Sequence, residues 1–73
     1  MLNPGDEYVG NMVQIRREQL RITVVELASK LGLTHQQMME AEYGRRRLGA
    51  SKLYELSLIM KVPVAYFICG FKA

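Results

Sequence analysis

The sequence predicts an all-α fold built from five short helices. Apolar residues recur at helical spacing between Pro4 and Pro63, and no segment there alternates in the way that a half-buried strand requires. The composition agrees, because 49% hydrophobic residues in a chain of 73 are enough for one small core and too many for a disordered chain. We expect residues 1–73 to form a single domain whose core spans about residues 8–68.

The first helix is expected to run from about Asp6 to Leu20. The Asp6 side chain can cap its N-terminus, since a side-chain oxygen at that position accepts a hydrogen bond from a free backbone N–H. Val9 and Val13 share one face of this helix with Leu20. Arg21 interrupts the pattern, so we expect the helix to end before it.

The second and third helices begin at matching four-residue patterns. Thr23 with Glu26, and Thr34 with Gln37, fit the capping box, in which each side chain bonds the backbone N–H of the other residue. Gly32 separates the two helices, because glycine adopts the positive φ of a sharp helix end without strain. The predicted inward positions are Leu27, Ala28, Leu31, Met38, Ala41 and Glu42. The predicted outward positions of the third helix are His35, Gln36, Met39, Glu40 and Tyr43.

Two further helices follow an exposed basic loop. Gly44 ends the third helix, and three arginines occupy residues 45–47. A fourth helix is expected from about Ala50 to Met60, with an inner side made of Leu53, Leu56, Ile59 and Met60. Pro63 suits the first turn of a fifth helix that ends near Cys69.

Two short capped helices joined by Gly32 and Leu33 have the arrangement of a helix-turn-helix. Such a unit holds its second helix clear of the body, so that the N-terminal end of that helix can enter the DNA major groove. The free N–H groups and positive dipole at this end also favour a phosphate. The second and third helices therefore form a candidate DNA-binding unit.

Two segments of the chain carry a family resemblance. Residues 23–34, TVVELASKLGLT, and residues 42–47, EYGRRR, resemble the Cro/C1-type (XRE-type) helix-turn-helix regulators. The resemblance extends over roughly Tyr8 to Ile68, and the later runs ASKLYEL and VPVAYF are especially like a bacterial regulator subgroup. It implies a lambda-repressor-like DNA-binding domain. The implied function is sequence-specific transcription regulation, by a dimeric repressor that inserts helix 34–43 in the major groove of a palindromic operator.

The resemblance also implies roles for individual residues. Among them Gln36 is the strongest candidate for reading a base, since glutamine can pair bidentately with adenine. The implied base contacts are His35, Gln36, Met39 and Glu40. The implied phosphate contacts are Thr34, Gln37, Tyr43, Arg45, Arg46, Arg47 and Lys52. Arg17 and Glu42 correspond to a buried ion pair of the family.

Three positions depart from the family pattern. The family usually has glutamine, which contacts phosphate, where this chain has Val24. Glycine is common where this chain has Arg21, which predicts a slightly strained turn. A basic or neutral residue usually stands where this chain has Glu40, and a carboxylate there costs affinity for DNA unless it accepts a hydrogen bond from a cytosine N4.

The apolar stretch at residues 64–71 has two interpretations. Val64 and Phe67 can complete the core of one chain. Alternatively, Tyr66, Ile68 and Phe71 form part of a two-fold interface between two chains, which is the interpretation we favour because most homodimer interfaces are symmetric patches. A homodimer of this kind would place two recognition helices about 34 Å apart, one turn of DNA.

Charge and composition restrict the other function classes. The net charge of +3 and pI of about 9.3 suit an acidic partner such as double-stranded DNA. No apolar run approaches a membrane span and the start of the chain is unlike a signal peptide, so we expect a cytoplasmic protein without membrane contact. The single Cys69 and single His35 offer no metal cluster.

No nucleophile–base set or phosphate-cradling loop is evident, so we expect neither an enzyme nor a cofactor. No appended effector domain or small-molecule site is evident either. The alternative to a DNA-binding regulator is a protein-interaction module, such as an antitoxin or anti-regulator, that reuses the helix-turn-helix with weak or no DNA binding. The position of the cations at residues 21, 45–47 and 52 relative to Gln36 should separate these two hypotheses.

Overall fold

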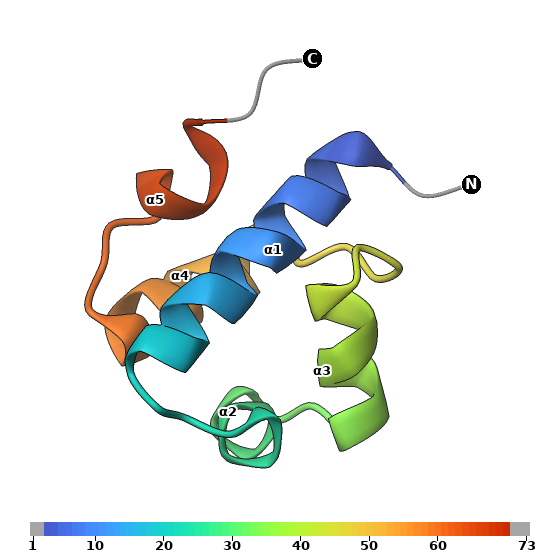
Figure 1. Cartoon of the computed structure of the whole chain (residues 1–73), viewed down its shortest axis with the longest axis vertical. Coiled ribbons are helices and arrows are strands. Elements are labelled where there is room, and N and C mark those ends of the chain that lie inside the picture. Colours follow the sequence, from blue (N-terminus) through green and yellow to red (C-terminus); the bar gives the residue numbers. More distant parts are fainter. Residues whose placement is uncertain (1–2, 71–73) are drawn as a thin grey trace.

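The computed structural model describes residues 3–70 and contains five helices and no strand in that range. The helices are α1 (Pro4–Gln19), α2 (Val24–Leu31), α3 (His35–Glu42), α4 (Ala50–Met60) and α5 (Ala65–Ile68). Figure 1 shows α1 running diagonally across the molecule, with α2 and α3 at its lower right and α5 at its upper left. The all-α prediction and the order of the five helices are confirmed.

The start of α1 differs from the prediction. Asn3, not Asp6, caps this helix, and its Oδ1 accepts hydrogen bonds from the backbone N–H groups of Gly5 at 2.7 Å and Asp6 at 3.3 Å. Pro4 occupies the first helical position, where its missing N–H and fixed φ are favourable. Asp6 therefore lies inside the first turn, where its negative charge interacts favourably with the positive end of the helix dipole.

Both predicted capping boxes are present. At α2, Thr23 Oγ1 accepts from the Glu26 N–H at 3.1 Å while Glu26 Oε1 accepts from the Thr23 N–H at 3.2 Å. At α3, the corresponding distances between Thr34 and Gln37 are both 3.0 Å. These reciprocal bonds satisfy backbone N–H groups that have no partner within the helix, so both short helices have defined starts.

Four helices end in the same way, with one residue in the left-handed region. These residues are Arg21, Gly32, Gly44 and Lys61, with φ of 58°, 71°, 80° and 57°. In each case the next residue donates its N–H to a carbonyl five residues earlier, at distances between 2.8 and 3.1 Å. This is the long bond of the Schellman motif. Glycine occupies two of these positions, and the other two hold side chains in a strained conformation.

The fifth helix is shorter than predicted. Pro63 precedes it instead of forming its first turn, and α5 itself spans one turn, Ala65–Ile68. The amides of Tyr66 and Phe67 bond carbonyls three residues back, at 2.9 and 3.0 Å. The chain after Pro63 thus winds first with 3₁₀ spacing, and an α-type bond from the Cys69 N–H to the Ala65 carbonyl at 2.8 Å closes the segment.

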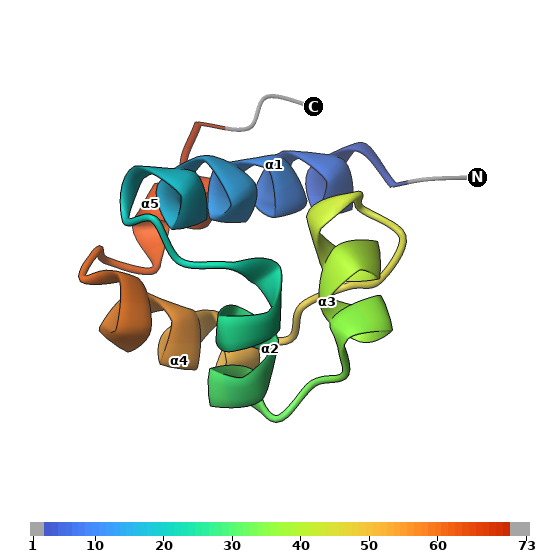
Figure 2. The ribbon, with the colours of Figure 1, turned by 60° about the horizontal axis from the view of Figure 1, so that its bottom comes forward.

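The core receives side chains from every helix. The most deeply buried are Val13, Leu27, Leu31, Met38, Leu56, Met60 and Phe67, each at most 1% exposed. Figure 2 shows α1 lying across the other helices; it packs against α3 and α5, and α2 packs against α3 and α4. A Cβ on Gly10 would lie 2.3 Å from the Ala41 carbonyl oxygen, so α1 and α3 approach closely there. In residues 3–70 no helix combines the length and apolarity needed to cross a membrane.

Candidate nucleic-acid interface

The helix α3 presents its first two residues to solvent. Its C-terminal side packs inward through Met38, Ala41 and Glu42, which are all buried. His35 and Gln36, at the first two helical positions, are exposed. The turn that holds this end consists of Gly32 in the left-handed conformation, Leu33, and the capping residue of α3. Two α3 positions that the sequence placed outward, Met39 and Glu40, are half-buried.

The ion pair between Arg17 of α1 and Glu42 of α3 is present. Arg17 Nε and Nη2 donate to the two carboxylate oxygens of Glu42 at 2.7 and 3.2 Å, with side chains only 12% and 5% exposed. Arg17 Nη1 also donates to the Ile22 carbonyl at 3.0 Å. The pKa of Arg17 is raised, chiefly because its side chain hydrogen-bonds the Glu42 carboxylate, although burial opposes this. The pair fixes the C-terminal end of α3 on α1.

The second carboxylate of α3 also faces a cation. Arg46 Nε lies 3.8 Å from Glu40 Oε1, and the two side chains are 41% and 39% exposed. Both acidic side chains of α3 therefore have a cationic partner, which removes much of the repulsion that an acidic recognition helix would exert on DNA. Sequence reasoning missed this pairing, although both residues flank the helix end that Gly44 forms.

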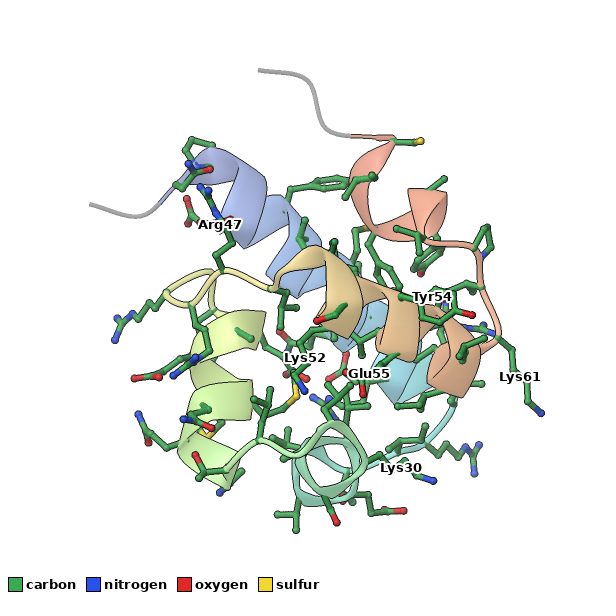
Figure 3. All side chains as sticks on the ribbon, turned by 180° about the vertical axis from the view of Figure 1, so that it is seen from behind. Lys30, Arg47, Lys52, Tyr54, Glu55 and Lys61 are labelled. Carbon is green, nitrogen blue, oxygen red and sulfur yellow. The ribbon has the colours of Figure 1, made fainter. Side chains whose placement is uncertain are left out.

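The other arginines near α3 and α1 have different surroundings. Arg47 Nε contacts Asp6 Oδ1 at 3.1 Å, so its side chain reaches the start of α1 while staying 70% exposed (Figure 3). Arg45 is exposed, and no carboxylate of residues 3–70 pairs with it. Arg21 is exposed at the turn after α1. Of these cations, only Arg46 is brought by a contact to the outward side of α3.

Lys52 is engaged inside the fold. Its Nζ donates to the Leu31 carbonyl at 2.7 Å and lies 3.3 Å from Glu55 Oε2. Figure 3 shows it beside Glu55 between α4 and α2, whereas Lys61 points away from the helices. A cation at the last carbonyls of α2 stabilises the negative end of that helix. To contact a phosphate, Lys52 would have to leave this position.

The other three predicted phosphate contacts differ in accessibility. Tyr43, the C-cap of α3, is 56% exposed. Thr34 is exposed, but its Oγ1 already accepts the capping bond. Gln37 is half-buried, and its Oε1 is used in the same capping box. A hydroxyl and an amide can still donate from their other atoms, so Thr34 and Gln37 keep hydrogen-bonding capacity toward a ligand.

The predicted dimer residues lie at the end of the fold. Tyr66 is half-buried and packs edge-on against Phe67, with ring centroids 5.3 Å apart. Ile68 is 45% exposed, and Phe71 lies outside the described residues. The structure adds two exposed apolar side chains on α4, Tyr54 and Leu58, at 60% and 62% exposed. Their exposure agrees with the predicted inner side of α4, since Leu56 and Met60 are buried and Leu53 and Ile59 pack against the core.

Known proteins resemble this chain in both sequence and structure. No established family profile matches it. An uncharacterized HTH-type transcriptional regulator of Sinorhizobium medicae is 42% identical over 65 residues, which cover 89% of this chain and 47% of that protein. A transcriptional regulator of Rhodospirillum rubrum, from an ATPase CF(0) region, is 39% identical over 62 residues, covering 85% and 57%. Over the aligned part, this chain is similar to HTH-type transcriptional regulators. The chain spans about half the length of these relatives.

Solved structures confirm the fold of this helix-turn-helix domain. The clp gene regulator ClgR from Corynebacterium glutamicum matches with a TM-score of 0.81 at 22% identity, over 89% of this chain and 69% of that chain. The restriction-modification controller protein C.AhdI from Aeromonas hydrophila matches with a TM-score of 0.79 at 16% identity, over 86% and 96%. HppE, crystallised with CoII and Tris buffer, matches at 0.82 and 21% identity, but over only 37% of its own chain. The fold therefore also occurs as one part of a longer protein.

Proposed function

We propose that this chain is a DNA-binding transcriptional regulator that inserts the N-terminal half of α3 into the major groove. The observation that carries the proposal is the exposure of His35 and Gln36 at the capped start of α3, in a helix-turn-helix whose relatives are transcriptional regulators. In this position, Gln36 reads an adenine through its amide, and His35, Met39 and Glu40 face the neighbouring bases. As a regulator of transcription the protein acts in the cytoplasm, and it is a binding protein and not an enzyme.

Affinity in this proposal comes from cations and from the helix end. Arg45 and Arg46, in the loop that follows α3, contact phosphates, and Tyr43 and Thr34 add hydrogen bonds. Arg47 contributes to DNA affinity once its side chain leaves Asp6 and contacts a phosphate instead. Because Lys52 is held by Leu31 and Glu55, we assign it to the stability of the fold before any phosphate contact. Binding should weaken as salt rises, since each phosphate contact releases counterions.

The active form in this proposal is a homodimer on a palindromic operator. Two copies would meet through the C-terminal apolar surface, to which Tyr66 and Ile68 contribute. The two α3 helices would then reach half-sites one helical turn apart. Repression follows when the occupied operator overlaps a promoter and excludes the polymerase.

Selection of randomised duplex DNA at two salt concentrations tests the proposal. We expect an enriched palindrome, and binding that weakens with salt. Replacing Gln36 with alanine should lower affinity for the enriched sequence by about 1–3 kcal/mol and leave nonspecific binding unchanged. Asn11→Ala, which removes an exposed amide from α1, is the matched control and should change neither.

The outcomes distinguish the possible errors. If Gln36→Ala keeps the full sequence preference, the reading face is assigned wrongly. Salt-sensitive binding without any enriched sequence would contradict sequence-specific regulation. If the wild-type domain binds no DNA at low salt, the protein-interaction hypothesis replaces this one, and the exposed Tyr54 and Leu58 are then the first surface to mutate.

A further inference from the structure

The starting observation is that one contact links the basic loop to the outward side of α3. Arg46 Nε lies 3.8 Å from Glu40 Oε1, and both side chains are about two-fifths exposed. Glu40 is one turn further along α3 than Gln36, so both side chains are on the same side of the helix. The carboxylate that Arg46 faces is therefore next to the residue that reads DNA in the proposed function.

The backbone fixes the position of Arg46 relative to Glu40. The Arg45 N–H donates to the carbonyl oxygen of Glu40 itself at 2.8 Å, and the Gly44 N–H donates to Ala41 at 3.2 Å. Gly44 is left-handed and sits against α1, since a Cβ there would lie 2.6 Å from the Glu7 Cα. The loop thus leaves α3 in one direction, with Arg46 one residue beyond a backbone bond to Glu40.

Chemistry limits what a carboxylate on this side of α3 can bind. An ionised carboxylate only accepts hydrogen bonds, so it needs a donor on a base edge. In the major groove the donors are cytosine N4 and adenine N6, and the N7 acceptor beside adenine N6 repels a carboxylate. Cytosine is the base that remains.

Arg46 assists such a carboxylate in two ways. Its positive charge offsets the repulsion between Glu40 and the DNA phosphates, and this effect grows when water leaves the interface. Because the Arg46 side chain is 41% exposed and a guanidinium carries five N–H donors, Arg46 can also donate to a phosphate. A single arginine can therefore hold the carboxylate and anchor the backbone.

We propose that Glu40 is a specificity-determining residue that selects cytosine, and that Arg46 is the positioning residue that holds its carboxylate for this contact. The proposal rests on the proposed function, because it requires α3 in the major groove. It assigns Arg46 a role that Arg45 lacks, although both are exposed arginines of the same loop.

The experiment measures Kd for the enriched operator and for operators changed at one base pair at a time. We expect the wild type to prefer cytosine about tenfold at one position, and Glu40→Ala to reduce that preference to near one. Arg46→Ala should reduce the preference at the same position severalfold. Arg45→Ala is the matched control: it should weaken all operators evenly and keep the preference. Melting curves verify that each variant is folded.

A double variant tests whether Arg46 acts through Glu40. If it does, Glu40→Ala with Arg46→Ala loses no more preference at that position than Glu40→Ala alone. Additive losses, or an Arg46→Ala variant that behaves like Arg45→Ala, would overturn the positioning role. If the wild type enriches an operator but Glu40→Ala keeps every base preference, this inference is overturned and the proposed function stands. A wild type that enriches nothing overturns the proposed function together with it.

Discussion

Removal of the Glu42 carboxylate should destabilise this domain strongly. Glu42 is 5% exposed and accepts two hydrogen bonds from Arg17, itself 12% exposed. The Glu42→Ala variant would leave the Arg17 guanidinium in a site that water barely reaches. Breaking a buried pair from one side costs about 3–5 kcal/mol, because the remaining charge is uncompensated.

The expected cost for this pair lies at the lower end of that range. Arg17 keeps its bond to the Ile22 carbonyl at 3.0 Å, and its residual exposure admits some water. A cost of about 3 kcal/mol compares with a total stability of about 3–5 kcal/mol for a core of this size. At roughly 4–8 °C per kcal/mol, the melting temperature should fall by about 12–24 °C.

Thermal and urea unfolding followed by far-UV circular dichroism measure this loss. Glu40→Ala is the matched control on the same helix: its half-exposed partner is 3.8 Å away, so the change should cost no more than about 0.5 kcal/mol. The double variant with Arg17→Leu and Glu42→Leu removes both charges and should recover much of the stability. A Glu42→Ala variant that melts within about 3 °C of the wild type would refute the argument that the pair is effectively buried.

Two further predictions concern the left-handed helix ends. Arg21→Gly and Lys61→Gly should each raise stability by up to about 1 kcal/mol in the same unfolding assay. The reason is that the relief of left-handed strain outweighs the added freedom of the unfolded chain. A loss of stability would show that these side chains make contacts that stabilise the fold by more than the strain costs. Gly44→Ala should destabilise the domain clearly more than Gly32→Ala. Both glycines have positive φ, but only at Gly44 would a Cβ meet backbone, with Glu7 Cα 2.6 Å away. Equal losses of stability would mean that α1 shifts without cost.

Local signals predicted the helix-turn-helix well. The Thr23 and Thr34 capping boxes and the position of Gly32 depend on residues three or four apart, so short-range chemistry determines them. The predicted Asp6 cap was wrong, because Asn3, three residues earlier, caps α1. Pro4 at the first helical position was the signal that favours Asn3.

Contacts between helices were harder to predict. The bond from Lys52 to Leu31 joins α4 to α2, and no pattern within either helix indicates how the two cross. The pair of Glu40 and Arg46 spans a helix end, where their spacing of six residues has no regular meaning until the left-handed Gly44 folds the loop back. The pairing of Arg17 with Glu42 was predictable only because the family resemblance supplied it.

The two ends of α3 are held in different ways, and this difference suits the helix for the DNA reading that we propose. At its C-terminal end, α1 fixes it through the Arg17–Glu42 pair and through the close approach of Gly10 to the Ala41 and Glu42 carbonyls. At its N-terminal end, Thr34 and Gln37 satisfy the free N–H groups from within the helix itself. The first turn therefore needs no cover from the rest of the fold, and His35 and Gln36 can stay exposed on a helix whose direction the other end determines.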